Sequence, residues 1–461
     1  MLPAVAIVGR PNVGKSTLFN QLTRSRDALV ADEPGVTRDR RYGIASHEGA
    51  RYVVIDTGGM GGVGEAGIDA EVDRQVAYAL DEADAIVLVV DRRDGMLAAD
   101  AEIAGRLRRS GKPVTVAVNK SEGLVAEIAA AEFHGLGLGE PEVIAARQGQ
   151  GVTRLIGRVL APFDLEPADE DADEDLPRLA VVGRPNVGKS TLINRLIGAD
   201  RLVTSPAPGT TRDSIVVPCE RDGYRFSLID TAGIRRRSRI DAGVEKFSVV
   251  QALRAIEEAG VVIVLIDARE GVTDQDLHLI GLAANRGSAL VIGINKWDGL
   301  ELPARRRIER EVDRQLQFVS YADRRYLSAL HGSGISEVVE SALRAYESAG
   351  RTIPTPRLNE LLREATTAHP PPVVRGRPVR LRYAHQGGRY PPLIVVHGSQ
   401  AERIPARYRR YLENSFRESL RLVGTPVRVE FRSGENPFAG RRNTLTPRQM
   451  RRRKRVIRHN R

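Results

Sequence analysis

Gly9-Arg10-Pro11-Asn12-Val13-Gly14-Lys15-Ser16 returns 174 positions later as Gly183-Arg184-Pro185-Asn186-Val187-Gly188-Lys189-Ser190. Both copies match G-x-x-x-x-G-K-[ST], a loop in which glycines let backbone N–H groups and a helix N-terminus surround phosphate oxygens. Each copy follows a short apolar run and precedes helix-forming residues. One such octamer could arise by chance in a surface turn, but two copies in the same strand–loop–helix frame predict two triphosphate sites.

The side chains of these loops have expected roles. Lys15 and Lys189 should reach the β- and γ-phosphates, where their charge also serves catalysis. The hydroxyls of Ser16 and Ser190 should bind Mg²⁺, which prefers oxygen ligands.

Composition sets the class of protein. A chain of 461 residues, 41% hydrophobic and 28% charged, is typical of a globular protein with about three domains. It contains no apolar run near the roughly 18 residues of a membrane span and no N-terminal secretion signal. We therefore expect a cytoplasmic protein, without a membrane partner, whose single cysteine, Cys219, is a buried thiol.

Further motifs recur at nearly the same offset. Thr37 and Thr211 lie 174 positions apart in similar Pro-Gly segments, and Asp56-Thr57-Gly58-Gly59 lies 174 positions before Asp230-Thr231-Ala232-Gly233. Asn119-Lys120-Ser121-Glu122 precedes Asn295-Lys296-Trp297-Asp298 by 176. A near-constant offset over about 110 residues indicates a duplicated domain.

Apolar β-branched runs alternate with helical patterns in each copy, which predicts a mostly parallel sheet covered on both faces. The expected fold class is α/β: two tandem P-loop GTPase domains, each with three layers, followed by a small α+β domain. In this small domain the pattern predicts an α-β-β-α-β order, with the second helix over residues 406–423. The predicted boundaries are 1–161 for the first GTPase domain, 162–177 for an acidic linker, 178–352 for the second GTPase domain, 353–440 for the small domain and 441–461 for a basic tail. Ligands should bind at the carboxyl ends of the strands.

Charge is distributed unevenly along the chain. Residues 371–461 carry 23 Arg+Lys and 5 Asp+Glu, a net of +18, so the first 370 residues carry 11 − 18 = −7. Residues 162–177 contain eight acidic residues and no basic one, which favours an extended linker, although such a segment could also dock on the basic end. The basic end favours a phosphate-rich partner, with a solubilising surface as the alternative.

The Asn-Lys-x-Asp motif selects the nucleotide base. The carboxylate of Asp298 can accept hydrogen bonds from N1 and N2 of guanine, for which adenine has no equivalent donor pair, and Asn295 should bond the acceptor side of the base. This motif argues against an alternative function, that of a metabolic ATPase or kinase. The first copy has Glu122 instead, whose extra methylene shifts the carboxylate, and we expect weaker base discrimination there.

The remaining motifs predict the hydrolytic machinery. Asp56 and Asp230 should hold Mg²⁺ through water, while the backbone N–H groups of Gly59 and Gly233 contact the γ-phosphate. Thr37 and Thr211 should complete the Mg²⁺ shell when triphosphate is bound, or else serve as turn residues. Met60 and Ile234 stand where Ras-type enzymes carry a water-orienting glutamine, and because neither can hydrogen-bond water, a second cation is a candidate for the missing charge.

Taken together, the motifs resemble the Der/EngA family of bacterial GTPases over essentially the full length. The resemblance implies two tandem G domains, a C-terminal KH-like domain, and a role in maturation of the large ribosomal subunit through nucleotide-regulated binding to ribosomal RNA. It also implies a potassium-stimulated GTPase in which Asn12 and Asn186 help to hold K⁺. We expect a monomer.

The KH-like domain departs from the ordinary pattern, because residues 357–461 contain no Gly-x-x-Gly, the loop that clamps a nucleic-acid backbone. The domain could bind RNA by another face or pack on a G domain. An alternative for the whole chain is a nucleotide-gated module at an anionic membrane surface, although the tail lacks a lipidation motif and an apolar face.

Overall fold

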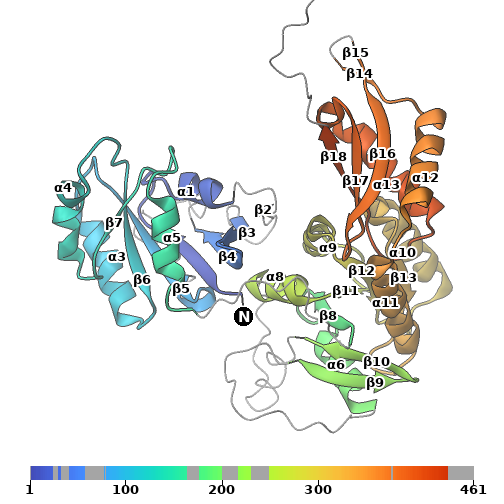
Figure 1. The fold of residues 1–461 in the computed structure, drawn as a ribbon. Helices are drawn as coiled ribbons and strands as arrows, with labels where there is room; N and C mark the ends of the chain where they lie inside the picture. The colour runs from blue at the N-terminus through green and yellow to red at the C-terminus, as the bar shows by residue number, and fades with distance from the viewer. Residues whose placement is uncertain are drawn as a thin grey trace, which may run out of the picture. The chain divides into compact units, whose positions relative to one another are not determined.

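The computed structural model describes residues 2–23, 30–32, 41–57, 77, 79–163, 176–199, 216–229, 249–374 and 377–433. The chain forms two compact units. Figure 1 shows the helices and strands of which they consist. The larger contains Met1–Arg351 with Arg389–Pro392 and Leu420–Val427, and the smaller contains Thr352–Gly388, Leu393–Ser419 and Arg428–Arg461.

The first sheet of the larger unit has seven strands in the order β2-β3-β4-β1-β5-β6-β7. Its central strands are parallel, whereas β2, β3 and β4 pair antiparallel. A two-residue loop joins β3 to β4 with positive φ at Glu48 and Gly49, the backbone of a tight hairpin. The strands are β1 Ala4–Val8, β2 Val30–Asp32, β3 Arg41–His47, β4 Ala50–Asp56, β5 Ala85–Asp91, β6 Val114–Asn119 and β7 Glu142–Val143.

Helices cover both faces of this sheet. On β1, Val5 and Ile7 belong to a buried cluster with residues of α1 and α5, while Ala4, Ala6 and Val8 join a cluster with residues of α3. This strand is buried on both faces, as expected for the centre of a three-layer domain. The helices are α1 Lys15–Leu22, α3 Ala98–Arg109, α4 Ala126–Ala130, the 3₁₀ helix Ala131–Leu136 and α5 Val152–Leu160.

The second sheet repeats this plan in the order β13-β12-β11-β8-β10-β9. Asp222 and Gly223 form the equivalent hairpin loop, again with positive φ. The strands are β8 Arg178–Gly183, β9 Val217–Arg221, β10 Tyr224–Leu228, β11 Val261–Asp267, β12 Ala289–Asn295 and β13 Asp323–Tyr326. The helices are α6 Lys189–Ala199, α8 Val249–Glu258, α9 Asp274–Arg286, α10 Leu302–Gln315, the 3₁₀ helix Gln317–Val319 and α11 Ile335–Gly350.

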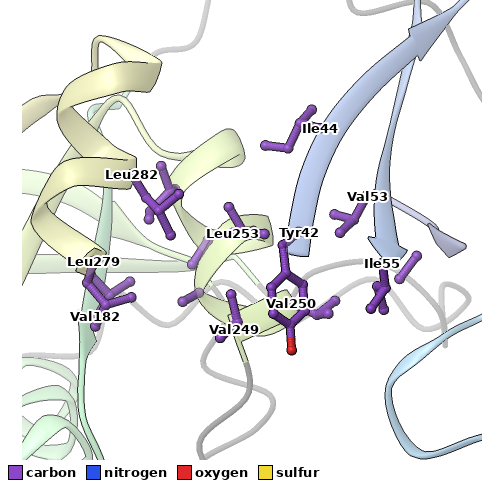
Figure 2. Close-up of a cluster of buried hydrophobic side chains, with 14 of the residues drawn as sticks. Tyr42, Ile44, Val53, Ile55, Val182, Val249, Val250, Leu253, Leu279 and Leu282 are labelled. Atoms are coloured by element: carbon purple, nitrogen blue, oxygen red, sulfur yellow. The ribbon is translucent and has the colours of Figure 1, made fainter. Parts of the chain in front are cut away.

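One buried cluster of the larger unit draws side chains from both sheets' domains. Tyr42 on β3 and Ile55 on β4 lie near Val250 and Leu253 of α8 (Figure 2). An ion pair of 2.5 Å joins Arg51 to Glu257, whose other carboxylate oxygen binds Arg286. Apolar burial and charge pairing thus act together within this unit.

The smaller unit has the predicted α-β-β-α-β order around a sheet β16-β17-β18. The expected helix over 406–423 ends at Ser419, and Arg421 has a φ of 52°, which is incompatible with a right-handed helix. The elements are α12 Thr355–Ala368, β14 Val373–Val374, β15 Arg377–Pro378, β16 Arg380–Gly388, β17 Leu393–Ser399, the 3₁₀ helix Ala401–Arg403, α13 Ala406–Ser419 and β18 Arg428–Ser433.

The mostly parallel sheets of the larger unit and the helices on their faces confirm the predicted α/β fold class. Cys219 is buried, as expected, and burial raises the pKa of its thiol to about 11. Among the described helices, none combines the length and the apolar character needed to cross a membrane.

Candidate nucleotide-binding sites

Each phosphate loop begins with a glycine at the end of a central strand. Gly9 has a φ of 153°, and a Cβ there would lie 2.3 Å from the carbonyl oxygen of Val89 on the neighbouring β5. Gly183 has a φ of 156°, and its Cβ would lie 2.7 Å from the oxygen of Leu265. Any side chain at these positions would collide with backbone, so the turn requires glycine.

The second glycine of each loop is close to the base-recognition motif. Gly14 and Gly188 both have a φ of 101°. A Cβ at Gly14 would lie 2.3 Å from Nδ2 of Asn119, and one at Gly188 would lie 2.2 Å from Nδ2 of Asn295. The phosphate loop and the Asn-Lys motif therefore pack directly together in both copies.

The two asparagines use both ends of their amides within the protein. Asn295 donates from Nδ2 to the Val187 oxygen at 2.7 Å and accepts from the backbone N–H of Ala329 at 2.8 Å. Asn119 makes the same pair of bonds, at 2.9 Å to Val13 and 3.0 Å from Ala146. Each asparagine thus links the phosphate loop to the loop that contains Ala146 or Ala329. A contact with the nucleotide base would be made in addition to these bonds.

The P-loop lysines lie against their own loops. Nζ of Lys15 donates to the carbonyl oxygens of Gly9 and Arg10, both at 2.7 Å, and Nζ of Lys189 donates to Arg184 at 2.6 Å. Lys15 is only 5% exposed. These ammonium groups already lie at the loop, where a short movement would bring them to bound phosphate.

Asn12 and Asn186 occupy the left-handed backbone region, with φ of 65° and 62°. Asparagine is one of the few residues with a side chain that adopts this conformation readily. The turn alone therefore accounts for asparagine here, and a role as a K⁺ ligand is additional to it.

Two oxygen-bearing side chains suited to Mg²⁺ flank the first loop in the fold, one at the end of β4 and one in the first turn of α1. Asp56 ends β4, is 1% exposed and pairs in register with Ile7, two residues before Gly9. Ser16 lies in the first turn of α1 and is exposed. A carboxylate and a hydroxyl at one sheet edge fit the hard oxygen ligands that Mg²⁺ prefers. Next to Asp56, Thr57 donates its hydroxyl to Ile7 at 2.6 Å, which anchors the end of the strand.

Several expected nucleotide contacts lie outside the described residues. They are Thr37, Gly58, Gly59, Met60, Thr211, Asp230, Thr231, Ala232, Gly233 and Ile234.

The two base-recognition carboxylates have different surroundings. Asp298 lies 3.0 Å from Nε2 of His331, and a hydrogen bond from Ser328 lowers its pKa, with smaller contributions from His331 and Arg269. Glu122 lies 3.4 Å from Arg93. Because Ala146 and Ala329 bind equivalent asparagines, Ala145 corresponds to Ser328, and it has no hydroxyl to offer. The structure therefore adds a second difference between the sites to the one expected from Glu122.

The third residues of the two motifs also differ. Ser121 is buried and donates its hydroxyl to Val118 at 3.2 Å. Trp297 packs against Tyr326, with ring centroids 4.2 Å apart, and the Arg305 guanidinium lies 5.5 Å from its ring.

Sequence reasoning missed the aspartates that hold the motif lysines. Lys296 pairs with Asp267 at 2.5 Å, and Lys120 pairs with Asp91 in the same way. Both lysines have positive φ, 62° and 63°. Asp91 and Asp267 lie 176 positions apart, the same offset as the two asparagines, so the repeat itself contained the signal.

A second missed pair fixes the P-loop arginines. Arg10 donates from Nε to Asp100 at 2.8 Å, and Arg184 donates to Asp276 at 3.0 Å. Both aspartates are 0% exposed and also accept the backbone N–H groups of Leu97 and Thr273, the N-cap residues of α3 and α9. Each P-loop is thereby attached to the start of the helix that follows the neighbouring strand of the sheet, α3 after β5 and α9 after β11.

Family models match most of the chain. The model described as 50S ribosome-binding GTPase matches residues 4–120 and 178–296, and the model described as the C-terminal KH-domain-like region of EngA bacterial GTPase enzymes matches residues 352–432.

Curated relatives match over the whole length. GTPase Der of Thioalkalivibrio sulfidiphilus is 55% identical over 462 residues, covering 100% of this chain and 99% of the relative. GTPase Der of Methylococcus capsulatus is 54% identical over 461 residues, with coverage of 100% and 99%. Among solved structures, a point variant of Aquifex aeolicus Era bound to GDP and AlF4⁻ matches at 22% identity and a TM-score of 0.29, covering 56% of this chain and 93% of that chain.

Replacing Asp298 with asparagine should change the base preference of the second site. The amide presents a donor where guanine also has a donor, whereas the O2 of xanthine can accept from it. We expect Asp298→Asn to shift preference from GTP to xanthosine triphosphate by about a hundredfold or more, because a mismatched buried hydrogen bond is costly. Competition binding in a Lys15→Ala background isolates this site, and an unchanged GTP preference would contradict the assignment.

Removing Asp100 should destabilise the first domain far more than removing Asp94. Both carboxylates bind Arg10, but that of Asp100 is 0% exposed and that of Asp94 is 52% exposed. We expect Asp100→Ala to lower the free energy of unfolding by about 3 kcal/mol, and Asp94→Ala by less than about 1 kcal/mol. Thermal unfolding of the two variants compares them, and equal losses would refute a structural role for the buried pair.

Proposed function

The chain belongs to the Der/EngA family of GTPases, and we propose that it uses GTP hydrolysis at two unequal sites to regulate its binding to the large ribosomal subunit. It is a GTPase with two G domains. We take residues 1–161 and 178–352 as these domains and residues 353–440 as the KH-like domain. Two nucleotide sites are proposed because the same asparagine hydrogen bond joins the phosphate loop to the base motif in both domains.

Within each site, the chain's own residues have separate tasks. Lys15 and Lys189 leave the loop carbonyls to neutralise the β- and γ-phosphates. Asn119 and Asn295 fix the distance between the base motif and the phosphate loop. With the phosphates bound in the loop, Glu122 or Asp298 then reaches the edge of the guanine base. Ser16 and Asp56 in the first site, and Ser190 and Asp230 in the second, would hold Mg²⁺, which would supply positive charge to the phosphate oxygens. Thr37, Thr211 and the N–H groups of Gly59 and Gly233 complete the machinery around the γ-phosphate.

We propose K⁺ as a second cation, beside Mg²⁺, at each site. Met60 and Ile234 cannot orient water, so transition-state charge needs another source. Asn12 and Asn186 lie in the phosphate loops, and their amide oxygens are suitable ligands for a monovalent cation.

The partner is proposed from charge and family. One matched family binds the 50S subunit, and the C-terminal quarter of the chain carries the net positive charge that RNA attracts. The protein would act as a cytoplasmic monomer in biogenesis of this subunit. The alternative, an anionic membrane surface, is less favoured because the matched family model is described as binding the 50S ribosome.

Binding to the large subunit should depend on the nucleotide at both sites. Lys15→Ala and Lys189→Ala each remove one charged phosphate contact, which should weaken GTP binding at that site by about tenfold or more. We expect sedimentation with 50S subunits to differ between GDP and a non-hydrolysable GTP analogue for the wild type, and to lose part of that difference in each variant. Sedimentation that ignores nucleotide and variant alike would reject the proposed regulation.

GTP hydrolysis should be faster in K⁺ than in Na⁺ at equal ionic strength, by about tenfold or more. Asn12→Gly and Asn186→Gly separate the two roles of asparagine, because glycine keeps the positive φ and removes the amide oxygen. These variants should bind GDP normally and lose the K⁺ advantage. A wild-type rate that is indifferent to the cation, or a K⁺ advantage that survives in the double variant, would exclude asparagine-bound K⁺.

A further inference from the structure

The sheet of the smaller unit has one face that packs on helices. Ala384, Ile394, Val396 and Phe431 are buried on this face, along with Leu412 and Phe416 of α13. The side chain of Asn359 on α12 donates to the oxygen of Ala384 at 3.1 Å and accepts from its N–H at 2.9 Å. Helices therefore occupy this side of β16-β17-β18.

The opposite face carries three adjoining rings, Tyr383, His385 and His397, which we call the ring platform. Side chains alternate along a strand, so His397 on β17 points away from its neighbour Val396. Tyr383 is directly opposite His397 in the β16–β17 register. The ring centroids lie 5.1 Å apart for the two histidines at an interplanar angle of 19°, 5.7 Å for Tyr383 and His385, and 5.9 Å for Tyr383 and His397.

The rings of the platform are partly exposed to solvent, and stacking rather than hydrogen bonding holds them together. Tyr383 is 44% exposed, and both histidines are half-buried. Nδ1 of His385 is buried and has no hydrogen-bond partner among the described residues, so the contacts with Tyr383 and His397 position this ring. By contrast, Tyr408 and Tyr411 on α13 donate their hydroxyls to His369 and Ala365 at 2.7 and 2.9 Å, as rings that stabilise the fold do.

Arginines surround the platform. Arg432 on β18 is in register with His397. Arg380 is in register with Ser399, which lies two residues after His397 and therefore on the same face of the sheet. Arg382 lies in the bulge between Leu381 and Tyr383. All three are exposed, and the acid beside them, Glu430, forms an ion pair with Arg432 at 3.2 Å. The face thus combines stacked rings with an excess of positive charge.

We propose that this sheet face is a binding site for single-stranded RNA, with unpaired bases stacked on the ring platform and phosphates bound by the arginines. Flat aromatic and imidazole rings on a sheet stack with bases of any sequence, while arginines track the backbone. Paired bases are already stacked inside a duplex and cannot use the rings. This site would replace the Gly-x-x-Gly clamp that the KH-like domain lacks, and it rests on the proposed function, since it assigns the RNA contact to named residues.

The test compares Tyr383→Ala with Tyr224→Ala in the full-length chain. Tyr224, on β10 of the larger unit, is 43% exposed and provides a matched loss of an exposed ring. The probe is a fluorescein-labelled, unstructured 12-nucleotide RNA, measured by anisotropy at 200 mM KCl, with a duplex of the same sequence as control. We expect Tyr383→Ala to weaken single-strand binding by about fivefold or more, and Tyr383→Trp to preserve it, because an indole also stacks.

Two further results complete the expectation: Tyr224→Ala binds like the wild type, and Tyr383→Ala leaves duplex binding and the GTPase rate unchanged. The proposal is overturned if the wild type does not bind the single strand, or if both tyrosine variants bind equally well. Failure of the proposed function is a separate result. A chain that binds the oligonucleotide through Tyr383 but does not sediment with 50S subunits would reject the ribosomal role and keep the site.

Discussion

The amide of one asparagine in each G domain determines how the nucleotide-binding parts fit together. Asn119 and Asn295 each end a buried strand, donate to a carbonyl of the phosphate loop and accept from the loop that follows the next strand. A buried amide with both ends satisfied fixes the distance between the two loops that it joins. The adjacent glycines, Gly14 and Gly188, have no room for a Cβ because this amide lies against them.

Around that link, the two domains share the ion pairs that hold the phosphate loop and the motif lysine. They differ around the carboxylate expected to contact the nucleotide base. Each P-loop arginine is held by a fully buried aspartate, and each motif lysine is held by the aspartate that ends the neighbouring strand. The surroundings of the two motif carboxylates are unequal: a hydrogen bond from Ser328 lowers the pKa of Asp298, whereas Ala145 stands at the position equivalent to Ser328 near Glu122. The two copies thus share the supports of the phosphate loop and differ around the carboxylate that we propose to read guanine.

Local sequence predicted the fold and the phosphate loops well, because glycine, lysine and strand patterns act over a few residues. The three sheets, the α-β-β-α-β order and the burial of Cys219 agree with expectation. Partners brought together by tertiary packing were harder to predict. The Asp100 and Asp276 anchors lie about 90 residues from their arginines, and the loops of Ala146 and Ala329 lie 183 positions apart, outside the repeat offset. The ring platform required strand register, since Tyr383 and His397 are 14 residues apart in sequence.

Each asparagine link should maintain one guanine-nucleotide site independently of the other. Calorimetric titration of GDP into Asn119→Ala and Asn295→Ala, with the wild type as reference, measures this independence. We expect two sites of different affinity in the wild type. Each variant should lose one site, the weaker in Asn119→Ala and the tighter in Asn295→Ala, and keep the affinity of the other. Two sites with unaltered affinities in either variant would contradict this expectation.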